Sequence, residues 1–162
     1  MTTQEQKISS EKLQGILENY PKERRYALAV MQDMQRMYNY IPREGLEALA
    51  EHIGCPISGL YSMATFYKAL SLKPKGKHII KVCDGTACHI RGSVNLVSSI
   101  YRTLGIKPGE TTGDGEFSLE LVNCVGSCAL APVMVVDETY YGKVTMESLP
   151  GILKAVREGA KL

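Results

Sequence analysis

Four of the five cysteines in this 162-residue chain stand in two closely spaced pairs in its second half. The first pair, Cys83 and Cys88, encloses four residues, and the second, Cys124 and Cys128, encloses three, with 35 residues between the pairs. A [2Fe–2S] cluster is bound by four thiolates, two on each iron. Because each pair could hold one iron, the spacing predicts one [2Fe–2S] cluster on these four cysteines.

Small residues fill the loop inside each pair. They are Gly85, Thr86 and Ala87 in the first loop, and Gly126 and Ser127 in the second. Side chains of this size allow backbone N–H groups to point at the sulfur atoms and to stabilise the negative charge of a cluster. The loop composition therefore supports the cluster prediction.

Other uses of the four cysteines fit the spacing less well. Zinc sites favour pairs with two intervening residues, which neither pair has, although a zinc-bearing interaction module remains an alternative. A dithiol oxidoreductase would show Cys-x-x-Cys, which is absent. A plant-type ferredoxin would carry a third cysteine where Arg91 stands, and a Rieske centre would need two histidines where only His89 is near. We expect His89 at the surface or at the start of a helix.

The fifth cysteine, Cys55, stands apart from the other four. It follows a predicted apolar helix and precedes Pro56. A lone cysteine in such a place behaves most often as a small hydrophobic residue. We therefore expect Cys55 to pack in the core and to take no part in cluster binding.

The first half of the chain has the periodicity of helices. Apolar residues recur three and four positions apart, Pro21, Pro42 and Pro56 stand where new segments begin, and Gly54 is placed to end a helix. The predicted buried stripes are Leu13, Ile16, Leu17 and Tyr20, then Tyr26, Val30, Met34 and Met37, then Leu46, Leu49, Ala50 and Ile53. With a fourth segment over 57–70, these stripes predict a small helical bundle.

The periodicity changes at a Pro/Gly/Lys linker over 72–76, where we place the boundary between domains 1–75 and 76–162. Beyond it, strands are expected at 78–82, 117–121, 133–136 and 140–144, with a closing helix from Thr145. After the first cysteine loop a helix of about a dozen residues is expected, with an apolar side made of Val94, Val97, Ile100, Tyr101 and Leu104. This order predicts an α+β fold in which a small mixed sheet follows a helical bundle.

Composition excludes several classes of function. The formal net charge is only +2 and no run of like charges occurs, so we expect no nucleic-acid partner. The polar N-terminal stretch lacks the apolar core of a signal peptide, and nowhere do eighteen apolar residues run together, so we expect a cytoplasmic protein without membrane insertion. Thiols stay reduced in the cytoplasm, which favours metal binding over disulfides.

The two longest distinctive segments, MATFYKALSLKPKGKHIIKVCDGTACHIRGS and LELVNCVGSCALAPVMVVDETYYGKV, resemble a known family. From about Pro21 to the last helix, the chain is similar to the thioredoxin-like [2Fe–2S] subunits of NADH dehydrogenases (the E-type subunit of NADH-quinone oxidoreductase) and of NAD(P)-linked and electron-bifurcating hydrogenases and formate dehydrogenases. The resemblance implies that Cys83, Cys88, Cys124 and Cys128 are the ligands and that the second half is thioredoxin-like. Ala69 departs from the aromatic residue that relatives often carry.

The resemblance also implies a partner, a flavoprotein subunit that binds FMN and NAD(H), beside a further iron–sulfur or catalytic subunit of the same complex. The chain itself has no Gly-x-Gly-x-x-Gly motif for a nucleotide, and the turn at Gly109, Gly113 and Gly115 has the wrong spacing. We therefore predict a non-catalytic electron-transfer subunit of an NAD(P)-dependent oxidoreductase complex, with the helical domain as its docking module. A free-standing [2Fe–2S] ferredoxin is the alternative.

Overall fold

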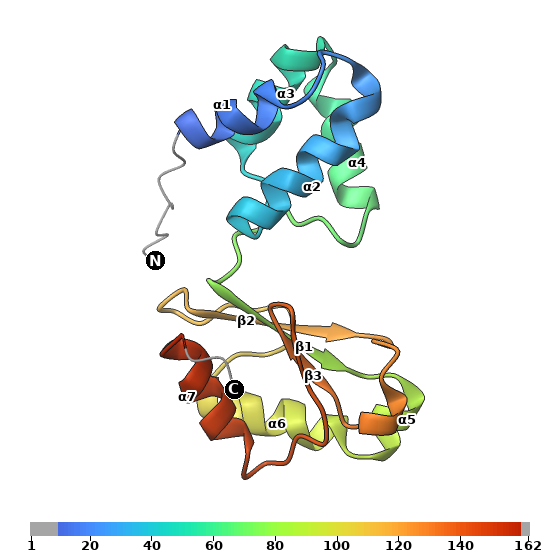
Figure 1. Cartoon of the computed structure of the whole chain (residues 1–162), viewed down its shortest axis with the longest axis vertical. Coiled ribbons are helices and arrows are strands. Elements are labelled where there is room, and N and C mark those ends of the chain that lie inside the picture. Colours follow the sequence, from blue (N-terminus) through green and yellow to red (C-terminus); the bar gives the residue numbers. More distant parts are fainter. Residues whose placement is uncertain (1–9, 160–162) are drawn as a thin grey trace. The chain divides into compact units, whose positions relative to one another are not determined.

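A computed structural model describes residues 10–159 of the chain, which divide into two compact units between Pro74 and Lys75 (Figure 1). The first unit is helical. Its elements are α1 (Ser10–Glu18), the short 3-10 helix η1 (Arg24–Tyr26), α2 (Ala27–Tyr38), α3 (Arg43–Ile53) and α4 (Ile57–Phe66). The predicted helical bundle is thus present.

The predicted stripes make most of the core of this unit. Leu13, Val30, Met34 and Leu49 are all buried, whereas Met37 is half exposed because it falls in the last turn of α2, where the stripe leaves the core. Helix α3 begins at Arg43, one residue later than predicted, because Pro42 is extended and forms its N-cap.

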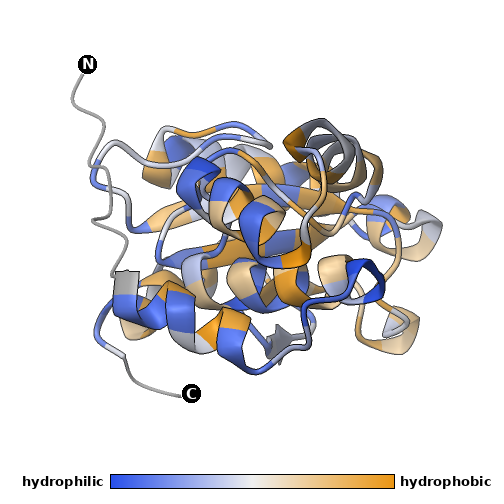
Figure 2. Ribbon diagram, turned by 90° about the horizontal axis from the view of Figure 1, so that it is seen from above, coloured by the Kyte–Doolittle hydropathy of each residue, from blue (hydrophilic) through white to orange (hydrophobic). Residues whose placement is uncertain are grey.

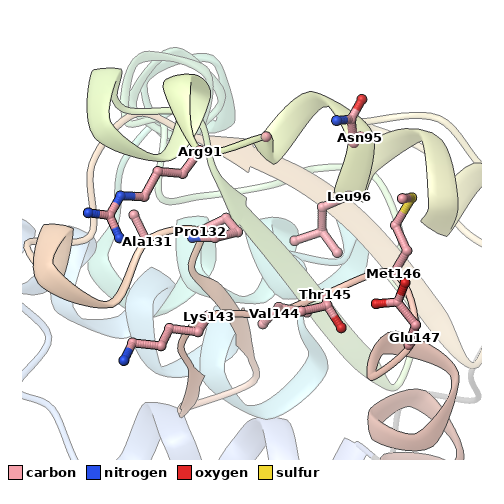
Figure 3. Close-up of a pocket in the computed structure, with 11 residues that line it drawn as sticks. Arg91, Asn95, Leu96, Ala131, Pro132, Lys143, Val144, Thr145, Met146 and Glu147 are labelled. Atoms are coloured by element: carbon pink, nitrogen blue, oxygen red, sulfur yellow. The ribbon is translucent and has the colours of Figure 1, made fainter.

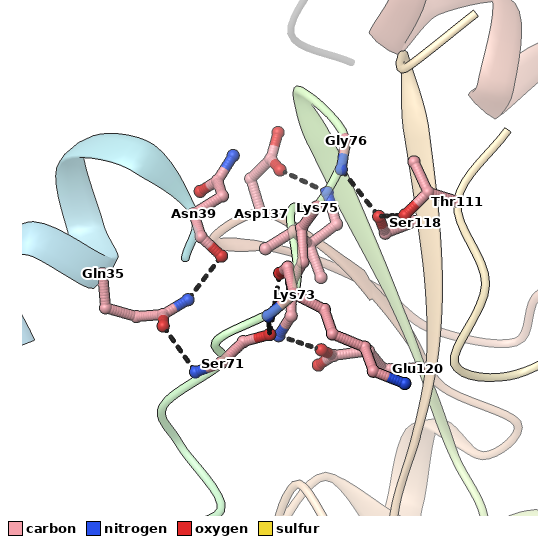
Figure 4. A network of polar contacts seen from close by, with 11 residues as sticks. Gln35, Asn39, Ser71, Lys73, Lys75, Gly76, Thr111, Ser118, Glu120 and Asp137 are labelled. Carbon is pink, nitrogen blue, oxygen red and sulfur yellow. Dashed lines mark hydrogen bonds and ion pairs between the residues drawn. The ribbon is translucent and has the colours of Figure 1, made fainter. Parts of the chain in front are cut away.

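Turn chemistry closes the helices of the first unit. Gly54 ends α3 in the left-handed conformation that glycine adopts without steric cost, as expected. At the end of α2, the Gln35 side chain donates to the carbonyl of Asn39 and accepts a hydrogen bond of 2.8 Å from the Ser71 amide (Figure 4). The side-chain amide of Gln35 therefore connects the segment after α4 to α2.

The second unit is built on a four-stranded mixed sheet in the order β2-β1-β3-β4. Strand β1 pairs in parallel with β2 and antiparallel with β3, which in turn is antiparallel to β4. The elements are β1 (His78–Cys83), α5 (Thr86–Ile90), α6 (Ser93–Leu104), β2 (Phe117–Val122), the 3-10 helix η2 (Cys128–Leu130), β3 (Met134–Val136), β4 (Thr139–Tyr141) and α7 (Leu149–Arg157). The predicted α+β class with a mixed sheet is confirmed.

One face of the sheet carries the main core of this unit. Ile80 and Leu119 from the strands pack with Ile100 of α6 and Leu153 of α7, all of them buried. Helices α6 and α7 therefore lie on the same side of the sheet (Figure 1). Figure 2 shows that hydrophobic and hydrophilic residues alternate along the helices, as expected of helices that bury one side.

Three details of the sequence prediction for this unit are wrong. The first cysteine loop contains the short helix α5. Its five residues are too few to show a helical periodicity in the sequence. The buried side of α6 is formed by Ser93, Leu96 and Ile100, whereas the predicted Val94 and Tyr101 are half exposed. The closing helix starts at Leu149 rather than Thr145, because residues 145–148 form a hydrogen-bonded turn before it.

The start of β1 is fixed to β2 by polar contacts. The Gly76 amide donates to the Ser118 hydroxyl at 2.7 Å, that hydroxyl also bonds to Thr111, and Lys75 forms an ion pair with Glu120 (Figure 4). These contacts hold the register of the two parallel strands at one end. The cysteines lie at the other end.

Candidate metal centre

The parallel pairing of β1 and β2 brings the two cysteine loops together. In the register of the pair, Cys83 at the end of β1 lies opposite Val122 at the end of β2. Because parallel strands end at the same edge of a sheet, the segments that follow start side by side. Cys124 comes two residues after Val122, so the first loop and the second loop leave the sheet at one place.

The first pair is buried. The exposed fraction is 2% for Cys83 and 1% for Cys88, and both pack in a small cluster with Ala131, Val133 and Val135. The backbone of Cys83 is fixed by a hydrogen bond of 3.1 Å from its N–H to the Val133 carbonyl. This pair therefore sits in a rigid and largely apolar setting.

The second pair lies on the surface. Cys124 and Cys128 are both exposed, and their Sγ atoms are 3.9 Å apart. The Gly126 amide points at Cys124 Sγ from 3.4 Å, as the small-residue loop predicted. Gly126 has φ +81°, a conformation that favours glycine, so this residue lets the loop turn its N–H toward sulfur.

The sulfur atoms influence one another. Burial acts to raise the pKa of Cys83, but the backbone amides of Gly85 and Val125 and the Cys88 thiol outweigh it, and the net shift is downward. Burial and the hydrogen bond to Cys83 raise the pKa of Cys88. The hydrogen bond to Cys124, and the charge of its sulfur, raise the pKa of Cys128. Charges on Cys83 also affect Cys128, so the two pairs share one electrostatic site.

Gly85 is the point at which the two loops touch. A Cβ atom added there would lie 2.7 Å from the carbonyl oxygen of Asn123 and 3.3 Å from Cys124 Cβ. The first distance is shorter than real Cβ contacts allow, and the neighbouring atom belongs to the backbone. Only glycine lets the loops approach this closely. The composition of the loop alone did not reveal this reason for a glycine at position 85.

Asp84 anchors the first loop. Its Oδ1 accepts hydrogen bonds from the Ser93 hydroxyl at 3.0 Å and from His89 Nδ1 at 2.9 Å. These hydrogen bonds, with His89 first, hold the pKa of Asp84 below its usual range. One carboxylate thus joins the end of β1, α5 and the start of α6. Its role was not found from the sequence, since an aspartate beside a cysteine has no distinctive pattern.

The donor set fits a cluster of two irons. Four thiols, two in each of two adjoining loops, match the ligand number of a [2Fe–2S] cluster, and amides aimed at sulfur stabilise its charge. Within residues 10–159, no three His, Cys, Asp or Glu side chains converge as a cage for a single metal ion. The sulfur atoms stand instead as two pairs.

The remaining predicted residues fall as expected. Cys55 lies in the helical unit, is partly buried and packs against the core of that unit. His89 is exposed in α5 and bonds to Asp84. Among the described helices, none has the length and apolar character needed to cross a membrane.

Comparison with known proteins identifies the family. Residues 13–157 match the thioredoxin-like [2Fe-2S] ferredoxin family, and the chain belongs to it. The predicted resemblance and the predicted cofactor, one [2Fe–2S] cluster, are therefore confirmed. The family defines the class of cluster and leaves open which cysteines of this chain bind it.

Individual relatives are subunits of larger oxidoreductases. The chain is 36% identical over 140 residues to the NADP-reducing hydrogenase subunit HndA of Solidesulfovibrio fructosivorans, covering 86% of this chain and 80% of that one. It is 32% identical over 144 residues to the E-type subunit of NADH-quinone oxidoreductase from Escherichia coli K12, covering 89% and 87%. The corresponding subunit of Aquifex aeolicus is 37% identical over 130 residues, covering 80% and 81%.

A solved structure supports the fold. The chain superposes on an NAD+-reducing [NiFe]-hydrogenase in the air-oxidized state with a TM-score of 0.69 at 16% identity, covering 81% of this chain. It spans only 23% of that hydrogenase chain. At this identity the match shows a shared fold.

Proposed function

We propose that Cys83, Cys88, Cys124 and Cys128 bind one [2Fe–2S] cluster and that the chain carries single electrons within an NAD(P)-linked oxidoreductase complex. The observation that carries this proposal is the meeting of both cysteine loops at the shared end of β1 and β2. When bound, the cluster supplies one-electron oxidation and reduction. The protein supplies the ligands, the charge compensation and the access.

The two pairs divide these tasks. Cys83 and Cys88 lie in an apolar setting that excludes water from one side of the site, and backbone amides offset the negative charge of the thiolates. Cys124 and Cys128 are exposed and leave the other side open to an approaching protein. Electrons would therefore enter and leave by way of the second pair.

A partner must perform the hydride chemistry. A nicotinamide delivers two electrons as a hydride, whereas one [2Fe–2S] cluster takes one, so a cofactor able to do both has to stand between them. A flavin is the usual choice. The chain lacks a Gly-x-Gly-x-x-Gly motif for a nucleotide. The relatives named as hydrogenase and NADH-quinone oxidoreductase subunits support a place in a complex of several subunits. The family resemblance in the sequence implies an FMN- and NAD(H)-binding flavoprotein as the partner, and this chain would then have a non-catalytic role.

The helical unit suits a docking role. An electron carrier needs only the sheet unit for its cluster, so the helical unit, which ends at Pro74, is free to bind other subunits. The five free thiols fit a reducing, cytoplasmic location.

Anaerobic mixing with NADH or NADPH tests this function. The purified chain alone should keep its visible absorbance, and adding the flavoprotein that co-purifies with it should bleach the cluster rapidly. Deleting residues 1–72 should weaken binding to that flavoprotein while the visible spectrum stays largely unchanged. Bleaching by the nicotinamide alone, in a preparation free of flavin, would show that the chain is an enzyme in its own right.

A further inference from the structure

A pocket of about 350 Å³ opens beside the cysteine loops (Figure 3). Its lining comes from three segments that adjoin the metal centre. Arg91 lies three residues after Cys88, Ala131 lies three residues after Cys128, and Lys143 lies in the turn after β4. The pocket is therefore attached to both ligand pairs.

Positive charge gathers at one end of this pocket. Figure 3 shows Arg91 and Lys143 extending to the same side, with Met146 and Glu147 at the opposite end. A hydrogen bond from Thr145 holds the pKa of Glu147 below its usual range, so this carboxylate stays ionised at its own end. Within the described part of the chain, neither Arg91 nor Lys143 forms an ion pair.

Lys143 has an unusual backbone conformation. Its φ is +52°, in the left-handed region where a Cβ atom is sterically costly. The other non-glycine residues of this kind in the described part of the chain are Asn39 and Asp137, whose short polar side chains tolerate the conformation. Glycine would be more stable at position 143. The lysine is thus present at the expense of local stability, which points to a role for its side chain.

The turn that carries Lys143 is fixed to the segment after the second cysteine pair. The Lys143 amide donates to the Leu130 carbonyl at 2.7 Å, and the Val144 amide donates to the Pro132 carbonyl at 3.2 Å. Gly142 packs so tightly that a Cβ there would lie 2.7 Å from Leu130 Cβ. The backbone of Lys143 is therefore held at a set position against the segment that follows Cys128.

Apolar residues are exposed next to both cations. Ile90 is 78% exposed and precedes Arg91, and Leu130 is 47% exposed and accepts the hydrogen bond from Lys143. Each lies two residues after a cysteine of the metal centre. Exposed aliphatic side chains flanked by cations are suited to a protein surface with acidic residues around an apolar contact, rather than to a small anion.

We propose that Ile90, Arg91, Leu130 and Lys143, here called the contact patch, bind an acidic surface of the protein that exchanges electrons with the cluster. This inference rests on the proposed function and specifies the chemistry of the partner. Complementary charge speeds the encounter of two proteins and sets their orientation. The contact patch would bring the partner to the exposed side of the metal centre, where electrons can pass.

Reduction of the cluster by the co-purifying flavoprotein tests the contact patch. Lys143→Glu or Arg91→Glu should lower the second-order rate constant about tenfold at low ionic strength, and this difference should shrink as salt is added. Lys143→Arg should keep the wild-type rate. Lys107→Glu makes the same charge change beyond the far end of α6 and should leave the rate unchanged. Reduction by dithionite and the visible spectrum should be the same in all variants.

Lys143→Gly separates the role of the side chain from folding. It should raise the temperature of unfolding by a few degrees, because the strain is relieved, while the reduction rate at low salt falls several-fold. A wild-type rate in both Lys143→Glu and Lys143→Gly would overturn the inference. An equal loss of reduction rate in Lys107→Glu would also overturn it. A third contradicting result would be that the chain forms a dimer through this patch, so that Lys143→Glu dissociates the dimer but does not slow reduction. A wild-type protein that no flavoprotein reduces would instead contradict the proposed function itself.

Discussion

The two cysteine pairs differ in burial and in what holds them. Cys83 and Cys88 are buried on a strand end and a short helix, with Asp84 and the Val133 carbonyl fixing the backbone around them. Cys124 and Cys128 are exposed on a loop and a single 3-10 turn. Both pairs offer the same chemistry.

This difference shows how one site can be both stable and accessible. If all four thiols bind the proposed cluster, the rigid, buried pair would fix its position and exclude water, and the exposed pair would leave a short path to a partner. Four equally buried thiols would leave no path to a partner, and four equally exposed thiols would not exclude water. The comparison predicts that the same substitution will have unequal effects at the two pairs.

Serine in place of a cysteine should have the largest effect at the buried pair. In Cys83→Ser or Cys88→Ser a hydroxyl, a poor ligand for iron, replaces a thiolate in a site that cannot rearrange, so the protein should purify with little or no cluster. In Cys124→Ser or Cys128→Ser the exposed loop can adapt. These variants should retain part of the cluster, with shifted visible bands and a changed electron paramagnetic resonance signal.

Iron content per chain and the spectrum of each variant measure this difference. Equal losses at all four positions would show that burial does not distinguish the pairs. Full retention in any one of the four would remove that residue from the ligand set.

Gly85→Ala should come next in size, with all cysteines intact. The added methyl group would lie 2.7 Å from the Asn123 carbonyl oxygen and must push the two loops apart. We expect clearly lower iron content and a cluster that is lost faster on warming. Gly113→Ala is the matched control, because no atom lies within 4 Å of its Cβ position and its φ is not in the left-handed region. Wild-type loading in Gly85→Ala would contradict the close approach of the loops.

Cys55→Ser should have a smaller effect, confined to the helical unit. The side chain is partly buried against that core, so a hydroxyl there should cost about 1 kcal/mol of unfolding free energy. Iron content and the visible spectrum should be unchanged. Chemical denaturation and iron analysis check both points, and bleaching of the cluster would make Cys55 a ligand and overturn the assignment.

The smallest effect is expected at Asp114, in the connection between α6 and β2. Hydrogen bonds from Thr112 and from the Glu116 amide, with the charge of Arg157, hold its pKa below the usual value. Since the folded pKa is below that of the unfolded chain, about 3.9, the carboxylate stabilises the fold above that pH and loses this contribution as the pH falls. Wild type should therefore exceed Asp114→Asn in stability by a constant amount from pH 7 to pH 5, and by less below pH 4.

Urea unfolding at several pH values, followed by circular dichroism, measures this difference. An Asp114→Asn variant whose deficit grows on acidification would show that the sign of the pKa shift is wrong.

Much of the fold and of the candidate site could be predicted from the sequence. The helical stripes, the strand before each cysteine loop and the cysteine spacing all depend on local pattern, which the sequence displays directly. The side of α6 that is buried could not be predicted correctly, because Val94 and Tyr101 are apolar residues that the sheet does not cover.

Features that depend on contacts between distant segments were not accessible to local patterns. The approach of Gly85 to Asn123 joins the two cysteine loops, and the packing of Gly142 on Leu130 joins the turn after β4 to the segment after the second cysteine pair. The hydrogen bonds from Ser93 and His89 to Asp84 are local in the sequence, but they depend on how the first loop folds, which no residue pattern displays. The small residues of the two loops indicated only in part that Gly85 lies so close to Asn123. The left-handed conformation of Lys143 has no sequence signal, since lysine does not favour it.

The central claim is tested most directly by one set of measurements on the purified chain. They are its content of iron, zinc and acid-labile sulfide, and its electron paramagnetic resonance spectrum after one-electron reduction. The full chain, purified without oxygen, should be red-brown and contain about two irons and two sulfides, and reduction should produce one paramagnetic centre. A colourless protein with one zinc per chain and no sulfide would contradict the assignment of Cys83, Cys88, Cys124 and Cys128 as ligands of a [2Fe–2S] cluster.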